Sequence, residues 1–108
     1  MYNTNNIFYK ILKKEVPAKI IHETETIICF YDINPKSKVH ALVIPKKEVI
    51  DFDDFIKQAS QIEVASFFKD VQVIAKDILK LNNFKILTNN GSGAGQEVFH
   101  FHIHIMGY

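Results

Sequence analysis

The strict alternation of histidine with apolar residues late in the chain constrains the fold more than any other feature. His100, His102 and His104 are each separated by one apolar residue, and the apolar character continues to Met106. Successive side chains of a β-strand point to opposite faces, so this alternation predicts a strand. We expect residues 98–106 to form it, with three imidazoles in a row on one face and an apolar face against the core.

Size, charge and hydropathy exclude several classes of protein. The chain has 108 residues, which predicts a single domain over residues 1–108 with the polar residues 1–6 as a disordered tail. Its formal net charge of +1 does not favour a nucleic-acid-binding surface, which carries a clear basic excess. No apolar run approaches the ~20 residues of a membrane helix, and the polar start lacks the pattern of a signal peptide.

The single cysteine bears on the compartment. Cys29 lies in the apolar run 27–31 and has no partner for an intramolecular disulfide. A buried and unreactive thiol is therefore expected, as is typical of a reducing compartment. We expect a cytoplasmic protein with no membrane segment.

Periodicity and capping signals predict an α+β domain. A short helix is expected from Ile7, with Asn5 or Asn6 as its N-cap, and a long helix from Ser60, which opens a capping box. Residues 51–56 are ambiguous. The expected strands are residues 19–23, 26–32, 40–44, 84–89 and 98–106. Short connections favour antiparallel pairing, so we expect a five-stranded antiparallel sheet with one long and one short helix.

The long helix is apolar on more than one side. Its main stripe includes Phe67, Val71 and Ile74, whereas Val73 and Leu79 lie off that stripe. Two interpretations stay open from these residues: the helix covers the sheet alone, or it also meets a second subunit.

A glycine-rich segment at residues 89–96 leads directly to the histidines. It holds three of the four glycines, so its backbone turns tightly or allows close approach. It has neither the spacing of a dinucleotide-binding loop nor the lysine of a Walker loop. A hairpin turn accounts for most of the glycines, but exposed amides in such a turn can also bind an anion.

Three interpretations of the histidine row compete. The row could be the solvated face of a strand, or a metal site with His40 or Glu97 as an additional ligand. The third is acid–base and nucleophilic chemistry at phosphorus, because a neutral imidazole attacks phosphorus near pH 7. The attacking nitrogen must then be bare, with the other nitrogen donating to a fixed acceptor. The neighbouring glycine loop favours the third interpretation.

The sequence resembles a known family over nearly its whole length. Residues 100–106 resemble the histidine triad motif, in which three histidines alternate with apolar residues and which gives the HIT superfamily its name. Further segments resemble the Hint branch, namely residues 7–21, 30–35, 39–47 and 95–99. Phe99 stands where the Fhit-like dinucleoside polyphosphate hydrolases usually have proline, which favours Hint.

The resemblance implies a fold and an activity. The fold would be HIT-like, with its sheet extended across a homodimer, and neither a metal nor a cofactor is implied. The protein would bind nucleotides and split the P–N bond of purine nucleoside phosphoramidates, such as AMP or GMP joined to an amine. His102 matches the nucleophile that forms a covalent nucleotidyl-histidine, His104 a phosphate contact, and His100 a residue that supports the nucleophile through its carbonyl.

The resemblance also implies a set of nucleotide contacts. Asp32 matches the carboxylate that hydrogen-bonds the ribose hydroxyls, and His40 and Gly95 match supporting residues near the triad. The phosphate side would be contacted by Asn89 and by the amides near Gln96, Glu97 and Val98. The base pocket would be lined by Ile7, Phe8, Ile11, Phe30 and Leu42.

Two departures from the family pattern concern the leaving group. Glu97 stands where some Hint proteins carry a serine that helps with the phosphoramidate. The chain ends at Tyr108, without the longer segment that many relatives use to reach the partner's site, so we expect loose specificity for the leaving group. The alternatives are a dinucleoside polyphosphate hydrolase, a nucleotide-binding regulator without catalysis, and a metal-binding protein.

Overall fold

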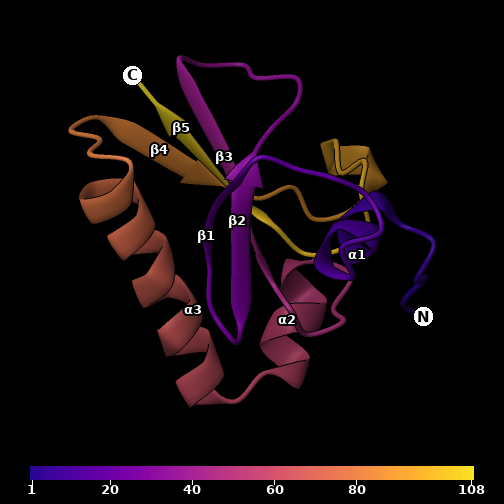
Figure 1. The fold of residues 1–108 in the computed structure, drawn as a ribbon. Coiled ribbons are helices and arrows are strands. Elements are labelled where there is room, and N and C mark those ends of the chain that lie inside the picture. Colours follow the sequence, from indigo (N-terminus) through magenta and orange to yellow (C-terminus); the bar gives the residue numbers. More distant parts are fainter.

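A five-stranded antiparallel sheet organises the computed structural model, which describes residues 1–108 (Figure 1). The strands lie in the order β1-β2-β3-β5-β4, so the last strand in the chain is inserted between β3 and β4. Their bounds are β1 (Ile20–Glu23), β2 (Ile27–Tyr31), β3 (Val39–Pro45), β4 (Phe84–Leu87) and β5 (Ile103–Gly107). The expected α+β fold with five antiparallel strands is confirmed.

The helices begin at the expected capping residues. In α1 (Ile7–Leu12), the Asn6 side chain accepts from the Tyr9 amide, and α3 (Gln61–Val73) opens with the expected capping box at Ser60. A π-helical turn, η1 (Ile74–Ile78), continues α3. The ambiguous segment is a second short helix, α2 (Phe52–Gln58), because the Asp51 side chain caps its first turn.

Each face of the sheet carries its own apolar cluster. On one face, β2, β3 and β5 pack against α3 through Phe67 and Val71, and on the other α1 packs through Phe8 and Ile11 (Figure 1). Strands buried on both faces read as continuous apolar runs, as β2 and β3 do. Leu42 lies in the α1-side cluster and pairs with His104, so this imidazole emerges on the α1 face.

The expected strand over residues 98–106 is wrong at its start. Strand β5 begins only at Ile103, so His104 lies in it while His100 and His102 precede it. The reason is that the Phe101 amide donates to the carbonyl of Val49 instead of to a neighbouring strand. The side chains nevertheless alternate, since Phe101 lies in the α3-side core while the flanking imidazoles lie on the other side.

The connection from β4 to β5 is longer than a hairpin turn. Residues 88–102 form it, and they include a 3₁₀ turn, η2 (Ser92–Ala94). Gly91 and Gly95 flank this turn with φ of +96° and +94°, a region that favours glycine. The loop places the two preceding histidines against β3 and the N-terminal segment.

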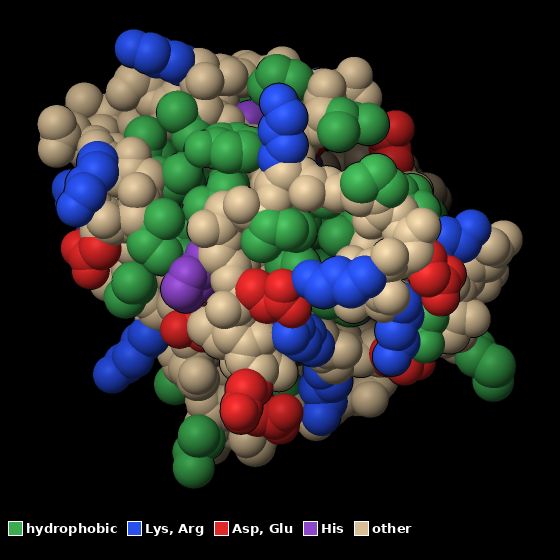
Figure 2. Space-filling model, in the orientation of Figure 1, with side chains coloured by type: hydrophobic (Ala, Val, Ile, Leu, Met, Phe, Trp, Pro, Cys, Tyr) green, Lys and Arg blue, Asp and Glu red, His purple; other side chains and the backbone are tan.

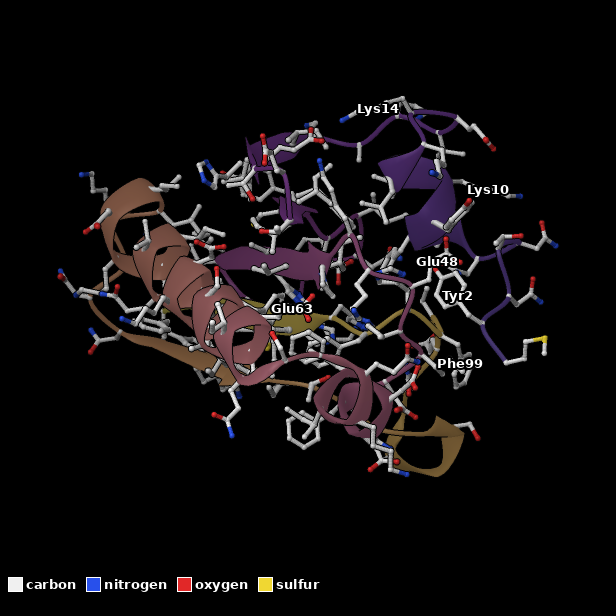
Figure 3. The ribbon with its side chains drawn as sticks, turned by 90° about the horizontal axis from the view of Figure 1, so that it is seen from below. Tyr2, Lys10, Lys14, Glu48, Glu63 and Phe99 are labelled. Atoms are coloured by element: carbon white, nitrogen blue, oxygen red, sulfur yellow. The ribbon has the colours of Figure 1, made fainter.

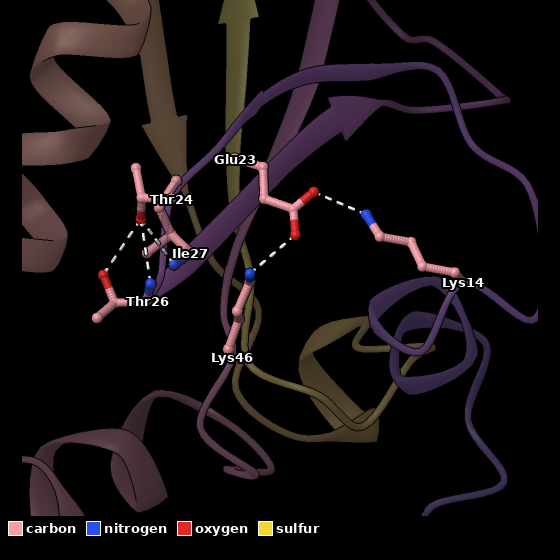
Figure 4. Close-up of polar contacts among 6 residues, drawn as sticks. All are labelled: Lys14, Glu23, Thr24, Thr26, Ile27 and Lys46. Carbon is pink, nitrogen blue, oxygen red and sulfur yellow. Dashed lines mark hydrogen bonds and ion pairs between the residues drawn. The ribbon is translucent and has the colours of Figure 1, made fainter.

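Two salt bridges connect the end of α1 to the sheet (Figure 4). The Glu23 carboxylate accepts from Lys14 at 2.7 Å and from Lys46 at 2.8 Å, which joins α1, β1 and the end of β3. In the adjacent turn, the Thr24 hydroxyl oxygen accepts from the amides of Thr26 and Ile27, both at 3.1 Å. Exposed ion pairs contribute little to stability, so the two salt bridges mainly orient α1 over the sheet.

The surface carries charges of both signs. On the face drawn in Figure 2, lysine side chains are interspersed with aspartate and glutamate, and that face has no uniformly basic stripe. None of the helices combines the length and apolar character needed to cross a membrane.

Candidate active site

Four of the five histidines gather on the α1 side of the sheet. The ring centres of His102 and His104 lie 4.9 Å apart, and those of His104 and His40 lie 5.2 Å apart. His100 is joined to this group through its carbonyl, which lies 2.7 Å from Nδ1 of His102. The fifth histidine, His22, lies on β1.

His102 is held with one nitrogen bare. A carbonyl can only accept a hydrogen bond, so Nδ1 of His102 carries the proton that it donates to the His100 carbonyl. Burial lowers the pKa of His102, which keeps the ring neutral at pH 7. Its Nε2 therefore presents a lone pair, which is the state that a nucleophilic imidazole requires.

His100 is fixed by two partners. Its Nε2 donates to the carbonyl of Pro45 at 2.7 Å, so the neutral ring has Nδ1 bare. That nitrogen accepts from the hydroxyl of Tyr2. The side chain is fully buried, and burial lowers its pKa to about 4.

A chain of hydrogen bonds also fixes His104. The Lys36 amide donates to Nδ1 of His40 at 3.0 Å, so the proton of His40 lies on Nε2. That Nε2 lies 2.9 Å from Nδ1 of His104, which accepts, and the proton of His104 is therefore on its own Nε2. This Nε2 is buried and has no hydrogen-bond partner in the chain.

His102 therefore has a nitrogen without a proton, Nε2, and the neighbouring His104 has an N–H without a hydrogen-bond partner. Burial, followed by the charges that His102 and His40 would carry, lowers the pKa of His104 to about 4. A buried N–H without a partner costs about 1–3 kcal/mol, so its retention points to a ligand oxygen or nitrogen that completes it. The site thus combines a nucleophile with a hydrogen-bond donor.

Asp32 adjoins the imidazoles at the end of β2. Its Oδ1 accepts from the Asn34 amide at 2.8 Å, and its Oδ2 lies 3.4 Å from Nε2 of His40. Ligand atoms of Asp32, His40 and His104 lie within 4.8 Å of one another, as in a metal site. A metal on Nε2 of His40 would force its proton onto Nδ1, against the Lys36 N–H, so the donor pattern favours hydrogen bonding over metal binding.

The expected base-pocket residues divide into two groups. Phe8, Ile11, Phe30 and Leu42 lie in the one buried cluster of the α1 face, and Phe8 meets the His102 ring edge-on at 4.9 Å. Ile7 lies outside the cluster and is 41% exposed. The apolar cluster therefore borders the nucleophile through Phe8.

The loop before the histidines is braced by a buried amide. The Gln96 side chain accepts from the Gly91 amide and donates to the carbonyls of Ile50 and Val98. The backbone N–H of Gln96 itself donates to Gly91, whereas the N–H groups of Glu97 and Val98 make no hydrogen bond within the chain. The structure thus leaves two adjacent amides available to an anion, while Gln96 acts as a brace.

Two further residues of this loop were expected to contact the nucleotide, Asn89 before Gln96 and Glu97 directly after it. Leu87, the last residue of β4, pairs with His104, and Asn89 follows it by two residues, beyond the paired strands. Glu97 is exposed and forms no ion pair. It borders a groove of about 340 Å³ whose other walls are Asn3, Asn5, Asn6, Ile7, Val98 and Phe99.

Sequence reasoning missed three groups that set the tautomers. They are the Tyr2 hydroxyl, the Lys36 amide and the Pro45 carbonyl. Tyr2 lies in the segment for which disorder is expected, and the other two act through backbone atoms, which no side-chain pattern reveals. From the residues alone His40 was considered only as an additional metal ligand, and its supporting place near the triad came from the family resemblance.

Comparisons with known proteins agree with this geometry. A family model described as HIT domain matches residues 13–108. An uncharacterized HIT-like protein of Rickettsia prowazekii is 46% identical over 108 residues, covering 99% of this chain and 90% of the relative. A solved structure described as a Hit-like protein has a TM-score of 0.87 at 41% identity, covering 95% of this chain and 98% of that one. A HIT family hydrolase from Clostridium thermocellum has a TM-score of 0.84 at 34% identity, with 98% and 92% covered.

Proposed function

The chain belongs to the HIT domain family, and on this premise we propose that it hydrolyses the P–N bond of purine nucleoside phosphoramidates. The family level supports a nucleotide-binding hydrolase. The observation that carries the finer proposal is the pairing of a bare Nε2 on His102 with an unpartnered, buried N–H on His104.

The first step forms a bond between His102 and phosphorus. The lone pair of Nε2 attacks the phosphorus, the P–N bond breaks, and the departing nitrogen takes up one proton from solvent to leave as the amine. The imidazolium formed on His102 is stabilised by the His100 carbonyl, which accepts from its Nδ1. In the second step water attacks the phosphorus and loses one proton to solvent, the electron pair of the breaking P–Nε2 bond returns to Nε2, and AMP or GMP is released.

Three groups surround the place where phosphate would lie. The N–H of His104 and the free amides of Glu97 and Val98 would donate to its oxygens. Asn89, two residues past the Leu87–His104 pair, is proposed as a further phosphate contact. Donors already oriented in this way stabilise the charge that develops during phosphoryl transfer.

The nucleoside would extend away from the phosphate. We propose that the Asp32 carboxylate binds the ribose hydroxyls, because its Oδ2 makes only the long contact to His40. The base would lie against the apolar cluster next to His102, with the exposed Ile7 at its rim. The leaving amine would occupy the groove beside Glu97.

A homodimer and a cytoplasmic location complete the proposal. Strand β4 is an edge of the sheet and exposes Ile86, which supports pairing with a second copy, and Val73 of α3 is also partly exposed. Cys29 is buried, and burial raises its pKa to about 12, so it is an inert thiol suited to a reducing compartment.

The decisive experiment measures AMP release from an adenosine phosphoramidate by the native chain and by His102→Ala. We expect the native chain to release AMP and the variant to lose at least about 10⁴-fold in kcat/KM. A covalent adduct of one nucleotidyl group on His102, trapped by acid-free quenching and mass spectrometry, is expected in the native chain only.

Four outcomes would contradict the proposal or favour one of the alternatives. Equal rates for the two chains would contradict the role of His102. Tight AMP binding without turnover would indicate a regulator, and faster cleavage of a dinucleoside polyphosphate would indicate that class of hydrolase. Loss of activity with a chelator would restore the metal-binding alternative.

A further inference from the structure

We propose that Tyr2, in the N-terminal segment, is a positioning residue that holds His100 so that its carbonyl orients the nucleophilic His102. This inference rests on the proposed function, because it assigns a residue to that reaction. The matched family model begins at residue 13, so the family match assigns no role to Tyr2.

The contact between Tyr2 and His100 joins residues 98 positions apart in the sequence. The Tyr2 hydroxyl reaches Nδ1 of His100, and the two rings meet edge-to-face with centres 5.4 Å apart. Since His100 gives its own proton to Pro45, the hydroxyl must be the donor. Tyr9 supports the Tyr2 ring from the other side, at 6.0 Å between ring centres.

The Tyr2 hydroxyl satisfies Nδ1 of His100, which is shielded from water. His100 is fully buried, so its Nδ1 would lose its only partner if the hydroxyl were removed. A bare nitrogen in that position would then bind a proton more readily, or the ring would turn toward another donor. Either change moves the backbone carbonyl that fixes the tautomer of His102.

The charged and titratable groups around this contact are few. His102 faces His100 from its own segment, and Tyr2 itself faces Tyr9 of α1 and Glu48 of the loop after β3. Figure 3 labels Tyr2 and Glu48. Burial, together with the charges of Glu48 and Tyr9, raises the pKa of Tyr2. The hydroxyl therefore stays protonated and remains a donor throughout the range in which His100 is neutral.

The test compares Tyr2→Phe with Tyr9→Phe in chains without an N-terminal tag. Both variants remove one hydroxyl from neighbouring rings, but the Tyr9 hydroxyl makes no hydrogen bond within the chain. In Tyr2→Phe we expect kcat to fall about tenfold with KM within about twofold. We also expect the acid limb of the pH profile to move up by about one unit, because the neutral form of His100 is less favoured. Tyr9→Phe should match the native chain.

A spectroscopic measurement decides the inference independently of turnover. In ¹⁵N spectra of the imidazoles, Tyr2→Phe should shift Nδ1 of His100 toward the value of an unbonded nitrogen and should also change the His102 signals. Far-UV circular dichroism and melting curves verify that both variants fold.

The outcomes separate this inference from the proposed function. Identical spectra and kinetics in the two variants would overturn the role of Tyr2, and so would a shift at His100 with kcat unchanged. If the native chain releases no AMP, the proposed function fails. The His102 resonances still decide whether Tyr2 orients that ring, and unchanged signals in Tyr2→Phe would overturn it.

Discussion

Nε2 of His40 donates to Nδ1 of His104 across 2.9 Å, and this contact decides which nitrogen of His104 carries a proton. The assignment originates at the Lys36 amide, which occupies the other nitrogen of His40. The main-chain N–H of Lys36, near the start of β3, thereby sets the tautomer of His104, whose ring lies beside the nucleophilic His102. All four imidazoles are therefore neutral, and Nε2 of His104 is the one N–H among them without a partner.

Replacing His40 should impair turnover more than binding. In His40→Leu, Nδ1 of His104 loses its donor, so its proton can move to that nitrogen and leave Nε2 without one. We expect kcat to fall about 100-fold with a small change in KM, measured by steady-state AMP release. His22→Leu, on β1, is the matched control, and an equal loss in both variants would contradict the relay.

Charge placed on Gln96 should unfold the loop. In Gln96→Glu, a carboxylate oxygen would face the carbonyls of Ile50 and Val98 in a buried position. Burying such a charge without a donor costs about 3–5 kcal/mol, which lowers the melting temperature by roughly 10 °C or more. Gln61→Glu, at the exposed first turn of α3, should leave the melting temperature unchanged or raise it slightly. Equal melting temperatures for the two variants would refute the bracing role.

Acid should destabilise the fold in two windows. The pKa of His100 and of His104 is about 4 in the folded chain, against about 6.5 when unfolded, so the unfolded chain binds more protons between these values. Stability is thus fully present above pH 6.5 and falls as pH drops toward 4, by up to about 1.4 kcal/mol per unit for each histidine. Hydrogen bonds from Lys14 and Lys46 lower the pKa of Glu23, whose contribution is lost only below its unfolded value near 4.5.

Urea unfolding at a series of pH values measures both windows. The free energy of unfolding should be constant from pH 8 to 7 and should decline between pH 6.5 and 4.5, before the carboxylates titrate. A flat profile down to pH 4.5 would show that the histidines are not held neutral by burial.

The charge of Glu97 should select the leaving amine. Glu97 is exposed and unpaired beside the groove, so its carboxylate favours a leaving group with a positive charge. In Glu97→Ser we expect the preference for a lysine-like over a neutral amine to fall up to about fivefold, as for an exposed ion pair. The ratio of the two kcat/KM values measures this preference. Glu25→Ser, outside the groove, should keep the native ratio.

The sheet edge that pairs in the dimer can be identified by charge. Ile86 on β4 is 46% exposed, and Ile20 on β1, at the opposite edge, is 43% exposed. We expect Ile86→Lys to convert a dimer to a monomer in light scattering, while Ile20→Lys remains dimeric. The reverse result would assign the interface to β1.

Local rules predicted the framework but not the tautomers. The capping box at Ser60 and the apolar runs of β2 and β3 are properties of neighbouring residues, and the structure has them as expected. The extent of the last strand was wrong, because the Phe101 amide donates to the Val49 carbonyl instead of to a neighbouring strand, although the side chains still alternate. Which nitrogen is bare depends on groups from residues 2, 36 and 45, which the chain brings together only on folding.

The insertion of β5 between β3 and β4 has a consequence for synthesis of the protein. Strands β3 and β4 share no hydrogen bonds, so a nascent chain that has left the ribosome only to residue 98 cannot join them in one sheet. Pairing over such sequence distances is slow, and both parts expose apolar surface until the central strand arrives. That strand brings His104, and His100 and His102 immediately precede it. A nascent chain that lacks β5 therefore cannot assemble the four-histidine centre.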